Sequence, residues 1–83
     1  MTKRLYVGNL SSEITEAQLS SKFSEHGKVS GVKLITDHST GRSLGYAFVE
    51  MDTPATARRV VDELDGETYD GSELRVRAAT GMR

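Results

Sequence analysis

The sequence predicts an α+β fold in which two helices cover one face of a four-stranded antiparallel sheet. Three observations lead to this prediction. Four segments have the two-residue alternation of strands, two have apolar residues at helical spacing, and they occur in the order strand, helix, strand, strand, helix, strand. The 83 residues suffice for one small core.

The first half of the chain predicts a strand, a helix and a second strand. Aromatic and β-branched residues predict a short strand over residues 5–7. A helix follows over about residues 16–26, because Thr15 and Gln18 have the spacing of a capping box. Residues 29–36 alternate in polarity and predict the second strand.

The second half predicts a loop, a strand, a helix and a last strand. The polar, turn-rich residues 37–43 predict the loop, and the third strand follows over 45–51. Thr53 and Pro54 are a helix cap and a proline at the first helical position, and Gly66 ends this second helix. A turn then leads into a last strand over residues 73–78.

This order of elements is typical of a ferredoxin-like βαββαβ sandwich. The chain contains no linker, repeat or low-complexity segment, so residues 1–83 are expected to form a single domain. Its core is expected over about residues 3–79, with 80–83 as a loose tail.

Composition excludes several classes of protein. Without cysteine there are no disulfides or thiolate metal sites, and His26 and His38 alone cannot hold a metal ion. No stretch approaches the roughly 18 apolar residues of a membrane span, and no signal peptide begins the chain. We expect a monomeric intracellular protein without cofactor, located in the cytoplasm, or in the nucleus if the chain is eukaryotic.

Strand alternation divides the strand residues between two faces of the sheet. The inward set packs with the helices: Leu5, Val7, Val32, Leu34, Ala47, Val49, Met51, Leu74 and Val76. Three aromatic residues, Tyr6, Tyr46 and Phe48, point outward, and they should cluster because the first and third strands are the central pair. An exposed group of this kind usually marks a binding surface. Two other interpretations are a slipped register that buries the rings, and simple cross-strand packing on an exposed face.

Basic residues accompany these rings, although the net charge is −1. Acidic residues lie mostly in the helical segments, whereas the strands and their ends carry many of the cations. Bases on the rings and phosphates at the rim would suit this distribution. The candidate binding residues are Tyr6, Tyr46, Phe48, Arg4, Lys33, Ile35, Arg42, Leu44, Arg75 and Arg77.

Two strands carry motifs that resemble those of the RNA-recognition motif family. The six-residue ribonucleoprotein motif is similar to Leu5-Tyr6-Val7-Gly8-Asn9-Leu10, and the eight-residue motif to Leu44-Gly45-Tyr46-Ala47-Phe48-Val49-Glu50-Met51. The resemblance covers nearly the whole chain and is nearest to small single-domain bacterial members. It implies single-stranded RNA as the partner, and single-stranded DNA is a further candidate.

The resemblance also implies roles for the rings and shows two departures. Tyr6 and Phe48 would each stack under a base, and Tyr46 would pack against a sugar or between nucleotides. Leu44 occupies a place where the family usually has a phosphate-binding arginine or lysine, for which Arg42 is the candidate substitute. Met51 replaces an inward aromatic residue, which concerns packing more than recognition.

Two rival functions use the same fold. A protein-binding module would use the sheet or a helix face, and apolar Leu44 and Ile35 favour it slightly. An enzyme such as an acylphosphatase-like hydrolase would need a phosphate cradle, but residues 8–11 are too short and poor in glycine. A catalytic triad is not indicated by the spacing of its candidates, which are Ser20, His26 and Asp37. The sequence therefore predicts a binding protein without catalytic residues.

Overall fold

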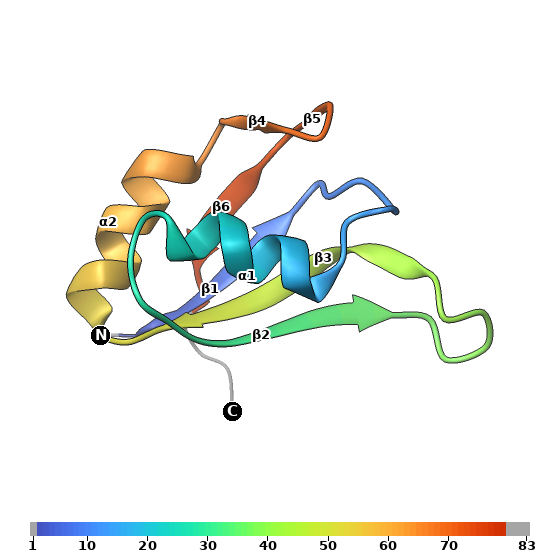
Figure 1. Cartoon of the computed structure of the whole chain (residues 1–83), viewed down its shortest axis with the longest axis horizontal. Coiled ribbons are helices and arrows are strands. Elements are labelled where there is room, and N and C mark those ends of the chain that lie inside the picture. Colours follow the sequence, from blue (N-terminus) through green and yellow to red (C-terminus); the bar gives the residue numbers. More distant parts are fainter. Residues whose placement is uncertain (1, 80–83) are drawn as a thin grey trace.

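The computed structural model describes residues 2–79 and confirms the predicted sandwich. The four strands of the main sheet are antiparallel in the order β2-β3-β1-β6, and both helices lie on one side of it (Figure 1). The elements are β1 Arg4–Gly8, α1 Glu16–Ser24, β2 Val29–Thr36, β3 Ser43–Met51, α2 Pro54–Leu64, β4 Thr68–Tyr69, β5 Ser72–Glu73 and β6 Arg75–Ala78. Residues 80–83, predicted as a tail, lie outside the described residues.

Both helices begin where their capping residues predict. The Thr15 hydroxyl accepts from the Gln18 amide at 3.2 Å, and the Gln18 side chain accepts from the Thr15 amide at 2.9 Å. The predicted end of α1 at His26 is wrong by two residues, since the helix ends at Ser24. The amide of His26 bonds three residues back to the carbonyl of Phe23, and this tighter turn closes the helix.

The predicted continuous last strand over residues 73–78 is also wrong, because the structure divides it. Its first residue belongs to β5, which pairs with β4 in a separate hairpin, while β6 joins the main sheet beside β1. Leu74 separates the two strands: its amide donates to the Glu67 carbonyl, and its carbonyl accepts from the Gly66 amide, each at 2.8 Å. These bonds hold the Leu74 backbone to the segment that follows α2, so the strand pairing with β1 begins only at Arg75.

The core lies between the sheet and the helices and confirms the predicted strand alternation. Seven of the nine residues expected inward are buried, and Val32 and Leu34 are partly buried on the edge strand β2. The helices and the β1–α1 connection supply the rest: Leu10, Ile14, Leu19, Phe23, Ala57, Val60 and Leu64. Within residues 2–79 no polar or charged residue is buried in this core.

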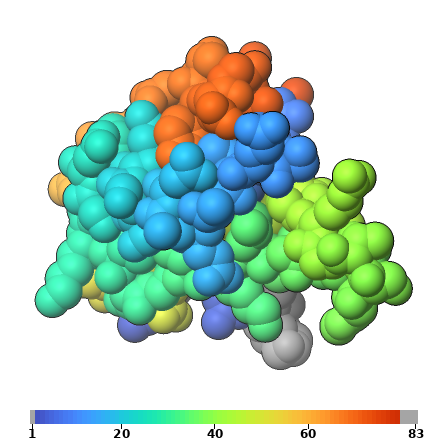
Figure 2. Space-filling view, turned by 45° about the vertical axis from the view of Figure 1, so that its right-hand side comes forward, coloured from blue at the N-terminus to red at the C-terminus, as the bar shows by residue number. Residues whose placement is uncertain are grey.

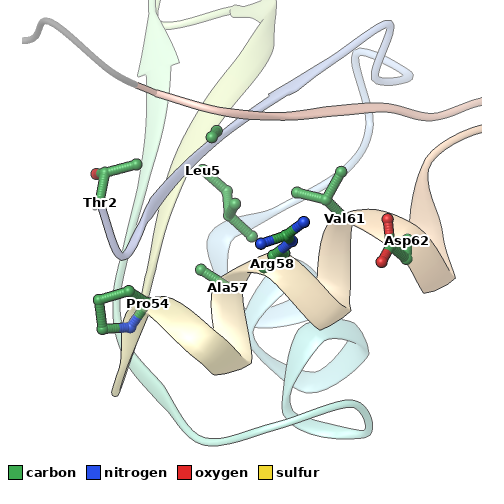
Figure 3. Close-up of a pocket in the computed structure, with 8 residues that line it drawn as sticks. Thr2, Leu5, Pro54, Ala57, Arg58, Val61 and Asp62 are labelled. Carbon is green, nitrogen blue, oxygen red and sulfur yellow. The ribbon is translucent and has the colours of Figure 1, made fainter.

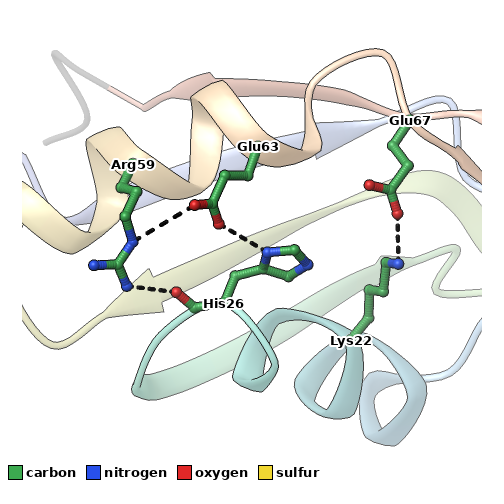
Figure 4. A network of polar contacts seen from close by, with 5 residues as sticks. All are labelled: Lys22, His26, Arg59, Glu63 and Glu67. Carbon is green, nitrogen blue, oxygen red and sulfur yellow. Dashed lines mark hydrogen bonds and ion pairs between the residues drawn. The ribbon is translucent and has the colours of Figure 1, made fainter.

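Charged side chains join the two helices to each other and to the segment that follows α2 (Figure 4). His26 Nδ1 lies 2.8 Å from a carboxylate oxygen of Glu63, and Arg59 donates to the His26 carbonyl at 2.6 Å. Lys22 forms an ion pair with Glu67. The hydrogen bond in this pair raises the pKa of Lys22 and lowers the pKa of Glu67. Part of the acidic charge of the helical segments is thus matched by cations within the helix layer.

The β4–β5 hairpin lies beside α1 (Figure 2). Its Tyr69 hydroxyl donates to the Gln18 carbonyl at 3.3 Å, and the Lys22 ammonium lies 5.5 Å from the centre of the Tyr69 ring. This tyrosine therefore has a structural role on the helix layer, away from the rings of the sheet. No helix within residues 2–79 is both long enough and apolar enough to cross a membrane.

Candidate nucleic-acid interface

Three aromatic rings lie together on the open face of the sheet. Tyr6 on β1 and Phe48 on β3 are directly opposite each other, and Tyr46 lies two residues from Phe48 on the same strand. Ring centres are 5.9 Å apart for Tyr6 and Tyr46, 6.2 Å for Tyr6 and Phe48, and 6.1 Å for Tyr46 and Phe48. All three side chains are half-exposed. We call this cluster of Tyr6, Tyr46 and Phe48 the aromatic platform. The slipped register that would have buried the rings is excluded.

The absence of a side chain on Gly8 leaves space for the ring of Tyr6. A Cβ atom on Gly8 would overlap the Tyr6 hydroxyl and come within 2.8 Å of Cε2 and Cζ of the ring. Residues two apart on a strand share a face, so the Tyr6 ring lies over the backbone of Gly8. Only a residue without a side chain leaves this space free.

One row of residues crosses the sheet through the platform and ends in a cation at each edge. Lys33 on β2 is opposite Phe48, which is opposite Tyr6, which is opposite Arg77 on β6. Both cations are exposed. A strand of nucleic acid lying along this row would meet rings at its centre and positive charge at both sides.

A second row runs beside the first. Glu50 on β3 is opposite Arg4 on β1 and opposite Gly31 on β2. A shallow hollow of about 410 Å³ opens here, lined by Arg4, Gly31, Val32, Lys33, Phe48 and Glu50. We call it the Phe48 hollow. Arg4 and Lys33 are among the binding residues predicted from the sequence, whereas Gly31 and Glu50 are not. Pairing the outward-facing residues of β3 with their neighbours on β1 and β2 would have found them.

The loop between β2 and β3 extends beyond the rest of the molecule (Figure 1, Figure 2). Its shape depends on Asp37, whose carboxylate accepts from the amides of Ser39 at 2.7 Å and Thr40 at 3.1 Å. Arg42 is exposed in this loop, and Leu44, at the start of β3, is 52% exposed. The loop therefore presents one cation and one apolar side chain next to the sheet.

The two remaining candidates differ in their placement. Arg75 is exposed on β6, opposite Gly8, and so extends the cationic edge that Arg77 begins. Ile35 is half-buried, at a shift of register between Leu34 and Thr36. Because of this shift, Ile35 is aligned with β3 less regularly than the other candidate residues on the strands are with their neighbours.

The residues considered for catalysis have structural roles or lie apart. Asn9 belongs to residues 8–11, the segment too short for a phosphate cradle. It has a left-handed backbone with φ of 60°, and its side-chain amide donates to the Glu73 carbonyl at 2.7 Å. Of the triad candidates, Ser20 lies on α1, His26 contacts Glu63, and Asp37 shapes the β2–β3 loop. Among residues 2–79, no three potential metal ligands come together.

An apolar groove lies on a different part of the surface, beside α2 (Figure 3). It measures about 400 Å³ and is lined by Thr2, Leu5, Pro54, Ala57, Arg58, Val61, Asp62 and Ala78. Arg58 and Asp62 give it charges of both signs, which does not suit a polyanion. It lies on α2, one of the helix faces open to the protein-binding alternative.

An open sheet face with clustered rings between cationic side chains is typical of proteins that bind single-stranded nucleic acid. The chain belongs to the RNA recognition motif family, whose sequence pattern it matches over residues 5–75. The predicted family membership is confirmed.

Three similar proteins place the chain within this family. The putative RNA-binding protein RbpD of Nostoc sp. (strain PCC 7120) is 48% identical over 75 residues, which are 90% of this chain and 80% of that protein. The chloroplastic 28 kDa ribonucleoprotein of Nicotiana sylvestris is 45% identical over 78 residues, which are 94% of this chain but only 28% of that protein. The chain thus spans less than a third of this longer relative. The crystal structure of RNA binding protein PG1 is 36% identical with a TM-score of 0.92, and the match covers 99% of both chains.

Proposed function

We propose that this protein binds single-stranded RNA by stacking bases on the aromatic platform. The observation that carries the proposal is the platform itself: three rings with centres about 6 Å apart, on the exposed sheet face, at the family's motif positions. Tyr6 and Phe48 would each support one base, and Tyr46 would pack against a sugar or between nucleotides. The names of the relatives, RNA-binding protein and ribonucleoprotein, support RNA as the ligand.

Stacking should contribute more to affinity than charge does. Each stacked base contributes about 1–3 kcal/mol, as judged by alanine substitution. The proposed phosphate contacts are Arg75 and Arg77 on β6 and Arg42 in the loop. All three are exposed, so dissolved salt screens their charge. Exposed Leu44 adds apolar contact but no charge. Weak general attraction for polyanions, combined with strong stacking, should favour unpaired strands over duplexes.

Chemical shifts of the backbone amides test the proposal. A short single-stranded RNA should shift amides of β1 and β3 around Tyr6 and Phe48, whereas a simple phosphate ester should leave them unchanged. Shifts concentrated along α2 and its groove would instead support the protein-binding alternative and contradict the proposal.

A matched pair of substitutions adds a binding measurement. Phe48→Leu removes a ring from the platform, and Tyr69→Leu removes a ring from the helix layer. Titration with the same RNA should show a several-fold weaker complex for the first variant and wild-type affinity for the second. Equal losses would mean that the platform does not hold the bases. Cytoplasmic location, a monomeric state and the absence of catalysis stay predictions.

A further inference from the structure

We propose that the Phe48 hollow selects guanine as the base that stacks on Phe48. This inference rests on the proposed function and adds a base identity to it. Phe48 forms the floor under the base, Glu50 reads the base's hydrogen-bond donors, and Arg4 and Lys33 meet its acceptors.

The register of the sheet puts these groups around one base. Glu50 follows Phe48 by two residues on β3, so both side chains rise from the same face. Such side chains stand about 7 Å apart. A base centred on the Phe48 ring would extend half of its width toward Glu50. The rest of the distance would hold one hydrogen bond of about 2.9 Å between the base edge and the carboxylate. Lys33 lies directly opposite Phe48 and Arg4 directly opposite Glu50, and directly opposite Cβ atoms are about 5 Å apart.

The charged groups of the hollow are free to bind. Among residues 2–79, the side chains of Arg4, Lys33 and Glu50 form no ion pair and no hydrogen bond. Arg4 and Glu50 are cross-strand neighbours of opposite charge, yet no guanidinium nitrogen of Arg4 lies within 4.0 Å of a carboxylate oxygen of Glu50. On the other side of Glu50, a Cβ atom on Gly31 would meet nothing within 4 Å. Glu50 and the Phe48 ring thus line the same hollow, which is open at Gly31.

A carboxylate beside a stacked base distinguishes guanine from the other three bases. Ionised carboxylate only accepts hydrogen bonds, through two oxygens that can bind two adjacent donors. Guanine offers two adjacent donors on its Watson–Crick edge, N1–H and the N2 amino group. Cytosine and adenine offer one amino group beside a ring nitrogen that accepts, and uracil offers one N3–H between two carbonyl oxygens. These acceptors would face the Glu50 carboxylate and repel it.

The two cations complete the pattern. Guanine carries the acceptors O6 and N7, for which arginine and lysine are the usual partners in specific recognition. A phosphate group is a poorer occupant of the hollow, because Glu50 would repel it. Glu50 only accepts hydrogen bonds, whereas Arg4 and Lys33 only donate them. This combination fits guanine, which has two adjacent donors and separate acceptors.

Short uridine oligomers test the inference when one internal position carries guanine, adenine, cytosine or inosine. The guanine oligomer should bind wild-type protein about tenfold tighter than the adenine and cytosine oligomers. Inosine lacks the N2 amino group and should lose most of this advantage. Equal affinity for guanine and inosine would overturn the role of paired donors.

Two variants then test the residue. Glu50→Gln replaces the two acceptors with one acceptor and one amide donor, and it should bind guanine and adenine oligomers within about twofold of each other. Glu13→Gln removes the same charge from an exposed position before α1 and should keep the wild-type preference. A guanine preference that persists in Glu50→Gln would overturn the assignment.

The outcomes separate this inference from the proposed function. If all oligomers bind equally and Phe48→Leu still weakens every one of them, RNA stacking stands and guanine selection is wrong. If the wild-type protein binds none of the oligomers, the proposed function is wrong and the inference falls with it.

Discussion

Replacing Gly8 with alanine should weaken RNA binding while leaving the fold intact. Gly8 lies in β1 opposite Arg75, with a backbone outside the left-handed region, so alanine can adopt its conformation. The added methyl group would overlap the hydroxyl of Tyr6 and lie 2.8 Å from two of its ring carbons. Since Tyr6 is half-exposed, its ring can swing away rather than force the strands apart.

The size of the effect follows from this displacement. Non-bonded carbon atoms prefer separations of about 3.5–4.0 Å, so the ring must move by roughly 1 Å or more. Such a movement disturbs the packing of Tyr6 on Tyr46, whose ring centres are now 5.9 Å apart. Complete loss of the base stack on Tyr6 would cost about 1–3 kcal/mol. A change of about 1.4 kcal/mol corresponds to a tenfold change in affinity. Complete loss of this stack would therefore weaken RNA binding by roughly fivefold to 150-fold.

The assay is a double-mutant cycle in RNA binding, combined with urea denaturation. Gly8→Ala should weaken binding in the wild-type background and have no further effect in the Tyr6→Ala background, because both changes remove the same stack. Its free energy of unfolding should be equal to that of the wild type or higher by about 0.4–1 kcal/mol, as for alanine at a compatible glycine position.

Two results would refute this reasoning. Wild-type affinity in Gly8→Ala would mean that the ring position over Gly8 does not matter for binding. A loss that is additive with Tyr6→Ala would mean that Gly8 acts by another route, such as direct contact between its backbone and the RNA.

Three further predictions concern charge and stacking. Phe48→Ala should weaken binding to short RNA more than Arg42→Ala at physiological salt, because a stacked base contributes about 1–3 kcal/mol and the exposed loop charge is screened; the reverse ranking would contradict it. Leu44→Lys should raise RNA affinity at low salt, because the side chain is 52% exposed and the change needs no repacking. The slope of log affinity against log salt concentration should steepen by about 0.7, which titrations at several salt concentrations would measure. Glu67→Gln should lower stability at pH 7 by a small amount that disappears in acid. The bond to Lys22 lowers the pKa of Glu67 below its ordinary 4.5. The stability that Glu67 contributes is therefore fully present above pH 4.5 and is lost as the pH falls through the pKa of the folded protein. Urea denaturation at pH 7 and in acid would measure this, and a stability difference between variant and wild type that persists in acid would contradict it.

The charge distribution explains why the net charge of −1 does not oppose binding to RNA. Glu63 pairs with Arg59 and Glu67 pairs with Lys22 within the helix layer, on the side of the sheet opposite the platform. Lys33 and Arg77 lie on the open face at the two sheet edges. The overall charge therefore says less about the ligand than the face on which each charge lies.

The order of the elements and the faces of the strands could be predicted from the sequence because both depend on neighbouring residues. Strand alternation is a property of one strand, so Tyr6, Tyr46 and Phe48 could be assigned to the outer face without knowledge of any partner strand. The capping box at Thr15 and Gln18 is equally local, and both of its bonds are present. The prediction failed at Leu74, where backbone bonds to Glu67 and Gly66 interrupt a strand that looks continuous in the sequence.

Only the tertiary structure decided which residues face one another across strands. Alternation put Lys33 and Glu50 on the outer face, but the register between β2 and β3 made Lys33 the partner of Phe48 and Gly31 the partner of Glu50. That register depends on the packing of the whole sheet against its helices and on a shift between Val29 and Gly31. The outward orientation of the three rings is thus determined by local sequence, whereas their contact across β1 and β3 and the Phe48 hollow beside them exist only because distant segments pair in this register.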